Sequence, residues 1–249
     1  MLRSTFASLA FVLLATGGAV SAPTVADILA AMKQGNYALA LRLARPLAEA
    51  GNAEAQAMVG NLYEMGLGVA PDQSKALKWF ALAADQGNVA AETALGRIYS
   101  QGAGVQMDAS KAYHWFSLAA NQGDTDAQCA IGDLYAEGNG VPQDYSEAVG
   151  WYRMAAEKSN DAAQAKLGLM YEIGKGVPQD YVQALMWFNL AASQSSSGVG
   201  PFAVAPGGIE SSFHEAAAKA RDRVAAKLTP EELAEAQRLA RGFQARSVP

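Results

Sequence analysis

The sequence repeats itself at a fixed interval of 36 residues. The segment KALKWFALAADQGN, residues 75–88, returns with the same alanines and the same kind of aromatic pair at three later places, which begin at Lys111, Glu147 and Gln183. Four units align without a gap: 53–88, 89–124, 125–160 and 161–196. A period of about 20–50 residues is typical of stacked repeat architectures. We therefore expect an elongated array rather than a compact globule.

Each unit is predicted to contain two helices joined by short turns. In the first unit the apolar residues Ala55, Val59 and Leu62 recur at helical spacing. Gly66 then supplies the backbone freedom that a helix end requires. Asp72 offers a carboxylate that can cap the free amides of a second helix. Because the turns are short, neighbouring helices should run antiparallel.

A glycine interrupts the first helix of every unit at the same position, as Gly60, Gly96, Gly132 and Gly168. Glycine inside a helix costs about 1 kcal/mol relative to alanine, so its recurrence predicts that another helix crosses closely there. Trp79 and Phe80 are expected to fill the space between stacked hairpins. A single hairpin cannot bury its own apolar face, so the units should form an all-α, right-handed α/α solenoid.

The repeated pattern A-x-A-x-x-x-(L/I/V)-G-x-(L/I/M)-Y-x-x-G-x-G-V, followed by the aspartate and W-(F/Y)-x-x-A-A, resembles the Sel1-like repeat, a relative of the tetratricopeptide repeat. The fourth unit departs from it near its end, where SQSS replaces the QG ending. The resemblance implies an interaction scaffold in which the first helix of each unit lines a concave face. Cysteine-rich members of this family have been described as penicillin-binding or hydrolysing, but this chain has a single cysteine.

The two ends of the array are expected to be covered by helices. Residues 23–52 align partly with the second half of a repeat, with Leu43 in place of tryptophan, and predict a degenerate capping hairpin. Residues 197–210 are rich in glycine and proline and predict a flexible linker. A helical hairpin is predicted over 211–246, with a capping box at Ser212 and a second helix that begins after Thr229. It would cover the open end of the stack or, alternatively, act as a detached docking module.

Residues 1–22 resemble a secretory signal peptide, with Arg3, a short apolar stretch and small residues before Pro23. An uncleaved anchor is the alternative, although the apolar stretch is shorter than the roughly 20 residues that span a bilayer. Because no other segment is apolar enough to cross a membrane, we expect no membrane span after cleavage. The expected location is periplasmic or secreted in a bacterium.

The residues that usually carry chemistry are scarce. The chain contains two histidines, His114 and His214, and one cysteine, Cys129, which is expected to be a small buried core residue. We therefore expect no catalytic residues, no metal site and no cofactor. The net charge of −5 argues against a nucleic-acid partner, because an acidic surface repels phosphate backbones.

One stripe on the first helix of each unit varies between copies while the packing positions stay fixed, and we predict that it contacts a partner protein or an extended peptide. The alternative is that these residues face solvent and have varied in sequence without a functional role. The candidate residues are Glu54, Met58, Asn61, Met65, Arg97, Gln101, Asp126, Asp133, Glu137, Lys166, Leu169 and Ile173.

Three functions are consistent with these features. The leading prediction is an exported, non-enzymatic protein–protein interaction scaffold. The second is a regulator of an envelope sensor or assembly factor, and the third is a hydrolase related to β-lactams or the cell wall. The sequence names neither the partner nor the oligomeric state.

Overall fold

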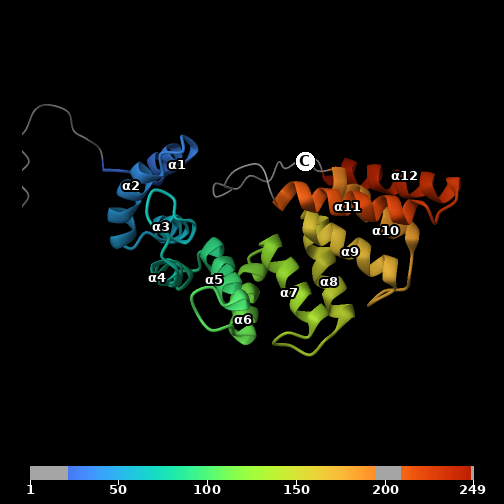
Figure 1. Ribbon diagram of the computed structural model, residues 1–249, viewed down its shortest axis with the longest axis horizontal. Coiled ribbons are helices and arrows are strands. Elements are labelled where there is room, and N and C mark those ends of the chain that lie inside the picture. Colours follow the sequence, from blue (N-terminus) through green and yellow to red (C-terminus); the bar gives the residue numbers. More distant parts are fainter. Residues whose placement is uncertain (1–21, 194–208, 248–249) are drawn as a thin grey trace, which may run out of the picture.

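The computed structural model describes residues 22–193 and 209–247, and every regular element in these two ranges is a helix (Figure 1). Helices α1 (Val25–Lys33) and α2 (Tyr37–Glu49) precede the repeats, and α11 (Ile209–Ala225) and α12 (Pro230–Ser247) follow them. The repeats supply two helices each: α3 (Ala53–Met65), α4 (Gln73–Ala84), α5 (Val89–Gln101), α6 (Ala109–Asn121), α7 (Thr125–Glu137), α8 (Tyr145–Glu157), α9 (Asp161–Ile173) and α10 (Tyr181–Ser193). The signal-like segment up to residue 21 and the linker from 197 to 208 lie outside the described residues.

Consecutive helices from α1 to α11 pack against one another, and they form a curved row that begins at α1 and ends where α11 and α12 both pack on α10 (Figure 1). Within each repeat the two helices pack against each other, and the second helix also packs against the first helix of the following repeat. The predicted all-α solenoid is therefore confirmed.

The helix ends follow the chemistry that the sequence predicts. Asp72 and Asp108 each accept a hydrogen bond at 2.9 Å from a backbone amide in the first turn of α4 and α6. At the other end of the first helices, Gly66 and Gly102 adopt left-handed φ angles of 68° and 71°. These local signals fix where each helix starts and stops, and so fix the 36-residue layer.

The glycine inside each first helix makes room for an aromatic ring of its own hairpin. A Cβ atom placed on Gly60 would lie 2.8 Å from the Phe80 ring, and one on Gly96 would lie 2.5 Å from the Phe116 ring. The predicted close approach is thus present, and its partner is the second residue of the aromatic pair. The preceding tryptophan is only half-buried in the first three repeats and is fully buried in the fourth, as Trp187.

A buried amide ties successive layers together at a position that the sequence analysis did not single out. The Nε2 atoms of Gln56, Gln128 and Gln164 donate hydrogen bonds of 3.1–3.2 Å to backbone carbonyl oxygens of the preceding helix. In the second repeat Glu92 takes this position and instead accepts a 2.8 Å bond from Gln122. Burial raises the pKa of the Glu92 carboxyl.

The two C-terminal helices pack on α10 from different sides, and they contact α10 far more than they contact each other. On the α11 side, Val224 joins a cluster with Leu185 and Phe188. On the α12 side, the rings of Phe243 and Trp187 lie 5.3 Å apart at 68°. These helices therefore cover the end of the array, and the alternative of a detached docking module is wrong.

The start of the first C-terminal helix differs from the prediction. Helix α11 begins at Ile209, three residues before Ser212, so Ser212 is a helical residue and not the expected cap. The cap predicted for the next helix, Thr229, is confirmed, because Glu232 N donates to Thr229 Oγ1 at 3.3 Å. Thr229 N also donates to Glu232 Oε2 at 2.8 Å, so a capping box forms there that was not predicted. Both positions carry the same sequence pattern, so the pattern alone did not decide which one forms a cap.

Candidate functional site

The predicted stripe lies on the first helices of the four repeats, α3, α5, α7 and α9. A groove lies over α5 and α7. The groove has a volume of about 350 Å³. Five of the predicted residues line it: Arg97, Gln101, Asp126, Asp133 and Glu137. The other seven do not line this groove.

Ion pairs between layers engage part of the stripe. Arg97 Nη2 lies 2.7 Å from Glu64 Oε2 in the preceding repeat, and Lys166 Nζ lies 2.6 Å from Asp133 Oδ2. Asp133 also accepts a 2.7 Å bond from the Tyr152 hydroxyl. The variation at these three stripe residues therefore reflects pairing between neighbouring repeats as well as any contact with a partner.

Met58 does not belong to the exposed stripe, and the prediction for this residue is wrong. Its side chain is 1 % exposed and lies in the core cluster that also contains Leu41 and Ala44 of α2. The stripe position it occupies faces the preceding layer. A long apolar side chain there packs into the core, whereas Lys166 at the same position in the fourth repeat reaches the ion pair described above.

The remaining stripe residues divide into an acidic middle and apolar ends. Glu137 is exposed and makes no ion pair with any described residue. Asp126 accepts a 2.7 Å bond from Asn160. Because Arg97 is neutralised by Glu64 and Asp133 by Lys166, Asp126 and Glu137 leave the groove with a surplus of negative charge.

Apolar and polar side chains flank this middle section. Met65 on α3 and Leu169 and Ile173 on α9 are each about 40 % exposed, whereas Glu54 is exposed and charged. The Oδ1 atom of Asn61 is buried and accepts no hydrogen bond from a described residue. These residues extend the surface on both sides of the groove.

Two of the side chains with potential chemistry, Cys129 and His114, lie in different surroundings, one buried and the other exposed. Burial raises the pKa of the Cys129 thiol to about 12, so it is protonated at neutral pH and is a poor nucleophile. His114 is exposed, with its ring 5.2 Å from that of Trp115. Among the side chains that the structure describes, in residues 22–193 and 215–245, no three His, Cys, Asp or Glu residues are grouped so that they could hold a metal ion.

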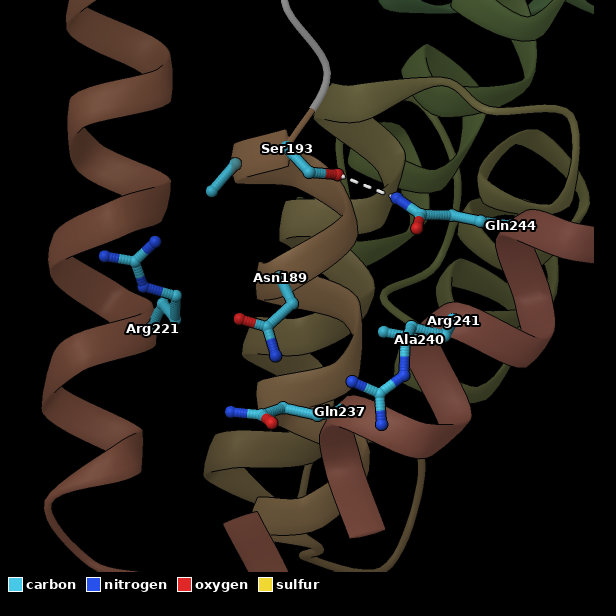
Figure 2. Close-up of a pocket in the computed structure, with 8 residues that line it drawn as sticks. Asn189, Ser193, Arg221, Gln237, Ala240, Arg241 and Gln244 are labelled. Carbon is cyan, nitrogen blue, oxygen red and sulfur yellow. Dashed lines mark hydrogen bonds between the residues drawn. The ribbon is translucent and has the colours of Figure 1, made fainter. Parts of the chain in front are cut away.

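A second groove, of about 280 Å³, lies where α10, α11 and α12 meet, as Figure 2 shows. Arg221 projects into it from α11 and Arg241 from α12, and Ser193 and Gln244 join across it through a 3.1 Å hydrogen bond. Arg221 pairs with its neighbour Asp222 at 2.8 Å. The sequence did not predict this groove because two of its three walls, α11 and α12, lie outside the repeat pattern.

The repeat boundaries agree with a known family. A family model described as Sel1 repeat matches four consecutive segments: 53–88, 89–124, 125–160 and 161–196. These segments make up more than half of the 249 residues. The chain belongs to the Sel1 repeat family. Sel1 repeat proteins are generally protein-interaction scaffolds, and their fold is typically non-enzymatic.

Solved structures with this fold support the same assignment. A Sel1 repeat protein from Oxalobacter formigenes is 28 % identical and superposes with a TM-score of 0.68, covering 86 % of this chain and 82 % of its own. A protective antigen from uropathogenic Escherichia coli strains that displays an SLR fold is also 28 % identical, with a TM-score of 0.52. That match covers 90 % of this chain and 54 % of the antigen. No curated protein matches the chain.

Proposed function

We propose that this Sel1 repeat protein is an exported scaffold that binds an extended segment of a partner protein in the groove over α5 and α7. The observation that carries the proposal is that five residues chosen for their variation between repeats line one groove. Variable residues on an otherwise constant framework are what partner choice requires, because the framework keeps the fold while the groove sets specificity.

The charge of the groove narrows the class of partner. Among the described residues, no basic side chain pairs with Asp126 or Glu137, whereas Arg97 and Asp133 are paired within the fold. A segment with a lysine or arginine that reaches Glu137 would complement this surface. The interaction is expected to weaken as salt concentration rises, because Glu137 is exposed to solvent.

Export is part of the proposal and is supported by residues 1–22 alone, which combine Arg3, an apolar stretch and small residues. Within the described residues, no helix has both the length and the apolar character that crossing a bilayer would need. The direct measurement is cell fractionation with N-terminal sequencing of the mature chain. An intact N-terminus on the cytoplasmic protein would overturn this part.

The groove is tested by affinity capture from a cell-envelope extract, followed by mass spectrometry, with two matched charge-reversal variants. Glu137→Lys changes the last residue of α7 inside the groove, and Glu157→Lys makes the same change at the last residue of α8 outside it. Because a cation is favourable near a helix C-terminus, both variants should fold.

We expect Glu137→Lys to lose the captured partner and Glu157→Lys to retain it. Identical capture by both variants and the unmodified chain would remove the groove from the interaction. If the captured protein is the outer domain of a sensor, the scaffold is a regulator of that sensor.

A further inference from the structure

One face of α10 is covered by α12, although the same face is open on the other repeats. Met186, Trp187 and Leu190 of α10 are all buried and share a cluster with residues of α12. The α12 residues in that cluster are Leu239, Ala240 and Phe243. Their spacing places them on one side of the helix, so α12 is an amphipathic helix seated on a repeat.

The equivalent residues of the preceding repeats are exposed. Leu82, Leu118 and Met154 stand where Leu190 stands in the fourth repeat, and they are 49 %, 37 % and 47 % exposed against 2 % for Leu190. The tryptophan beside each of them is half-buried rather than buried. The first three repeats therefore expose the tryptophan and the apolar residue three positions later, which the fourth repeat buries under α12.

Helix α8 has a further feature that the other open repeats lack. Gly150 lies inside this helix, and a Cβ atom placed on it would meet no atom within 4 Å. An interior glycine costs about 1 kcal/mol relative to alanine, and no packing contact with a described residue accounts for it. Long polar side chains, Lys78 and His114, stand at this position on α4 and α6. Gly150 therefore leaves a flat surface beside Trp151 and Met154.

We propose that the α8 ledge, formed by Gly150, Trp151 and Met154, binds an amphipathic helix of a partner protein in the manner in which α12 covers α10. The occupant is a helix because the equivalent face of α10 is covered by a helix, α12. A helix also satisfies its own backbone hydrogen bonds. It presents a leucine, an alanine and a phenylalanine along one edge, spaced as residues 239, 240 and 243 are.

A negative charge beside the ledge favours basic residues on the flank of the partner helix. Glu147, one turn before Gly150, is exposed and stands where Lys75 and Lys111 stand in the preceding repeats. Because the ledge lies on a second helix of a repeat and the groove lies over the first helices, the ledge is a separate surface from the one in the proposed function. The Glu137→Lys substitution should leave it unaffected.

The test uses a fluorescein-labelled synthetic peptide with the sequence of residues 230–247, which contains both the apolar edge and basic residues. Fluorescence anisotropy follows its binding to the full chain and to two matched variants. Met154→Glu places a charge on the ledge, and Met107→Glu makes the same change at a methionine that is 60 % exposed in a loop away from it. Circular dichroism checks that both variants are folded.

We expect saturable binding to the unmodified chain, a loss of at least about tenfold in affinity for Met154→Glu, and no change for Met107→Glu. A peptide in which the residue equivalent to Phe243 is alanine should bind at least about tenfold more weakly. Equal binding to all three chains would mean that the peptide replaces α12 on α10 or binds elsewhere, and would overturn the proposal. Absence of saturable binding would overturn it as well.

Discussion

The fourth repeat and the second repeat carry the same motif but have different surroundings. In the second repeat the outer face of α6 is open, with Leu118 37 % exposed, whereas in the fourth repeat α12 covers the equivalent Leu190. The repeat motif therefore determines the packing inside a layer, while the segment that follows the array determines whether the outer face is solvated. One sequence change marks the difference, because Met186 replaces the polar residue found at His114.

We expect the largest difference between the two repeats when their tryptophans are substituted and the free energy of unfolding is measured. Trp187→Ala removes a buried ring that packs on Phe243, and we expect a loss of about 3–5 kcal/mol in the free energy of unfolding. Trp115→Ala removes a half-buried ring and should cost about 1–2 kcal/mol. Urea denaturation of both variants measures the two losses. Equal losses would show that α12 contributes nothing to the burial of the fourth repeat.

A smaller effect is expected at the carboxylate that joins α9 to α11. Arg223 donates to Glu172 at 2.7 Å and 2.9 Å and, with Lys227, holds the pKa of this carboxyl below its ordinary value of 4.5. Glu172→Gln should cost about 1–2 kcal/mol at pH 7.

The sign of this effect can be checked by pH. A lowered pKa stabilises the fold above pH 4.5, and that contribution is lost as pH falls through the folded-state pKa. The unfolding free energies of Glu172→Gln and the unmodified chain should therefore converge as pH falls below the lowered pKa of Glu172. Curves that keep a constant separation would contradict a role for the ionised carboxylate.

The second repeat should be stabilised by restoring the residue found in its neighbours. Glu92→Gln replaces a buried carboxyl with an amide that can donate to the preceding helix as Gln128 does, and we expect a gain of about 1 kcal/mol. Burial raises the pKa of Glu92, so the ionised form becomes a larger penalty as pH rises through that pKa.

The gain should therefore be larger at pH 7 than at about pH 4, which thermal denaturation at the two pH values would measure. Gln128→Glu is the mirror control and should lower stability. A gain from both substitutions would refute the assigned hydrogen bond.

The smallest effect is expected on the open face. Leu118→Gln should change the free energy of unfolding by less than about 0.5 kcal/mol, because its side chain is already in contact with solvent. A loss above about 1 kcal/mol in urea denaturation would show that this face is buried in solution, for instance against a second copy.

Much of the layer structure could be predicted from sequence because its signals are local and periodic. Asp72, Gly66 and Gly60 each act within one hairpin, and each recurs every 36 residues. That the C-terminal helices cover the end of the array was predicted, but the face of α10 that α12 covers was not, because nothing in the amphipathic pattern of α12 says which surface it covers.

Within the candidate site, the sequence predicted five residues that share a groove and missed the contacts between layers. Arg97 and Glu64 are separated by 33 residues, and so are Lys166 and Asp133. This separation is one repeat of 36 residues less about one helical turn. Aligning each first helix with the first helix of the preceding repeat would therefore have revealed both pairs. Met58 was misassigned for the same reason, since its side chain faces a neighbouring layer rather than solvent.

These pairs also give the array a fixed order. Excising residues 125–160 would bring Lys166 opposite Arg97, and excising 89–124 would bring Asp133 opposite Glu64, so either deletion sets like charges against each other. Shortened chains of this kind should melt below the temperature expected from their length alone, and reversing one charge at the new junction should restore part of the loss. Although the four modules share one shape, they are not interchangeable.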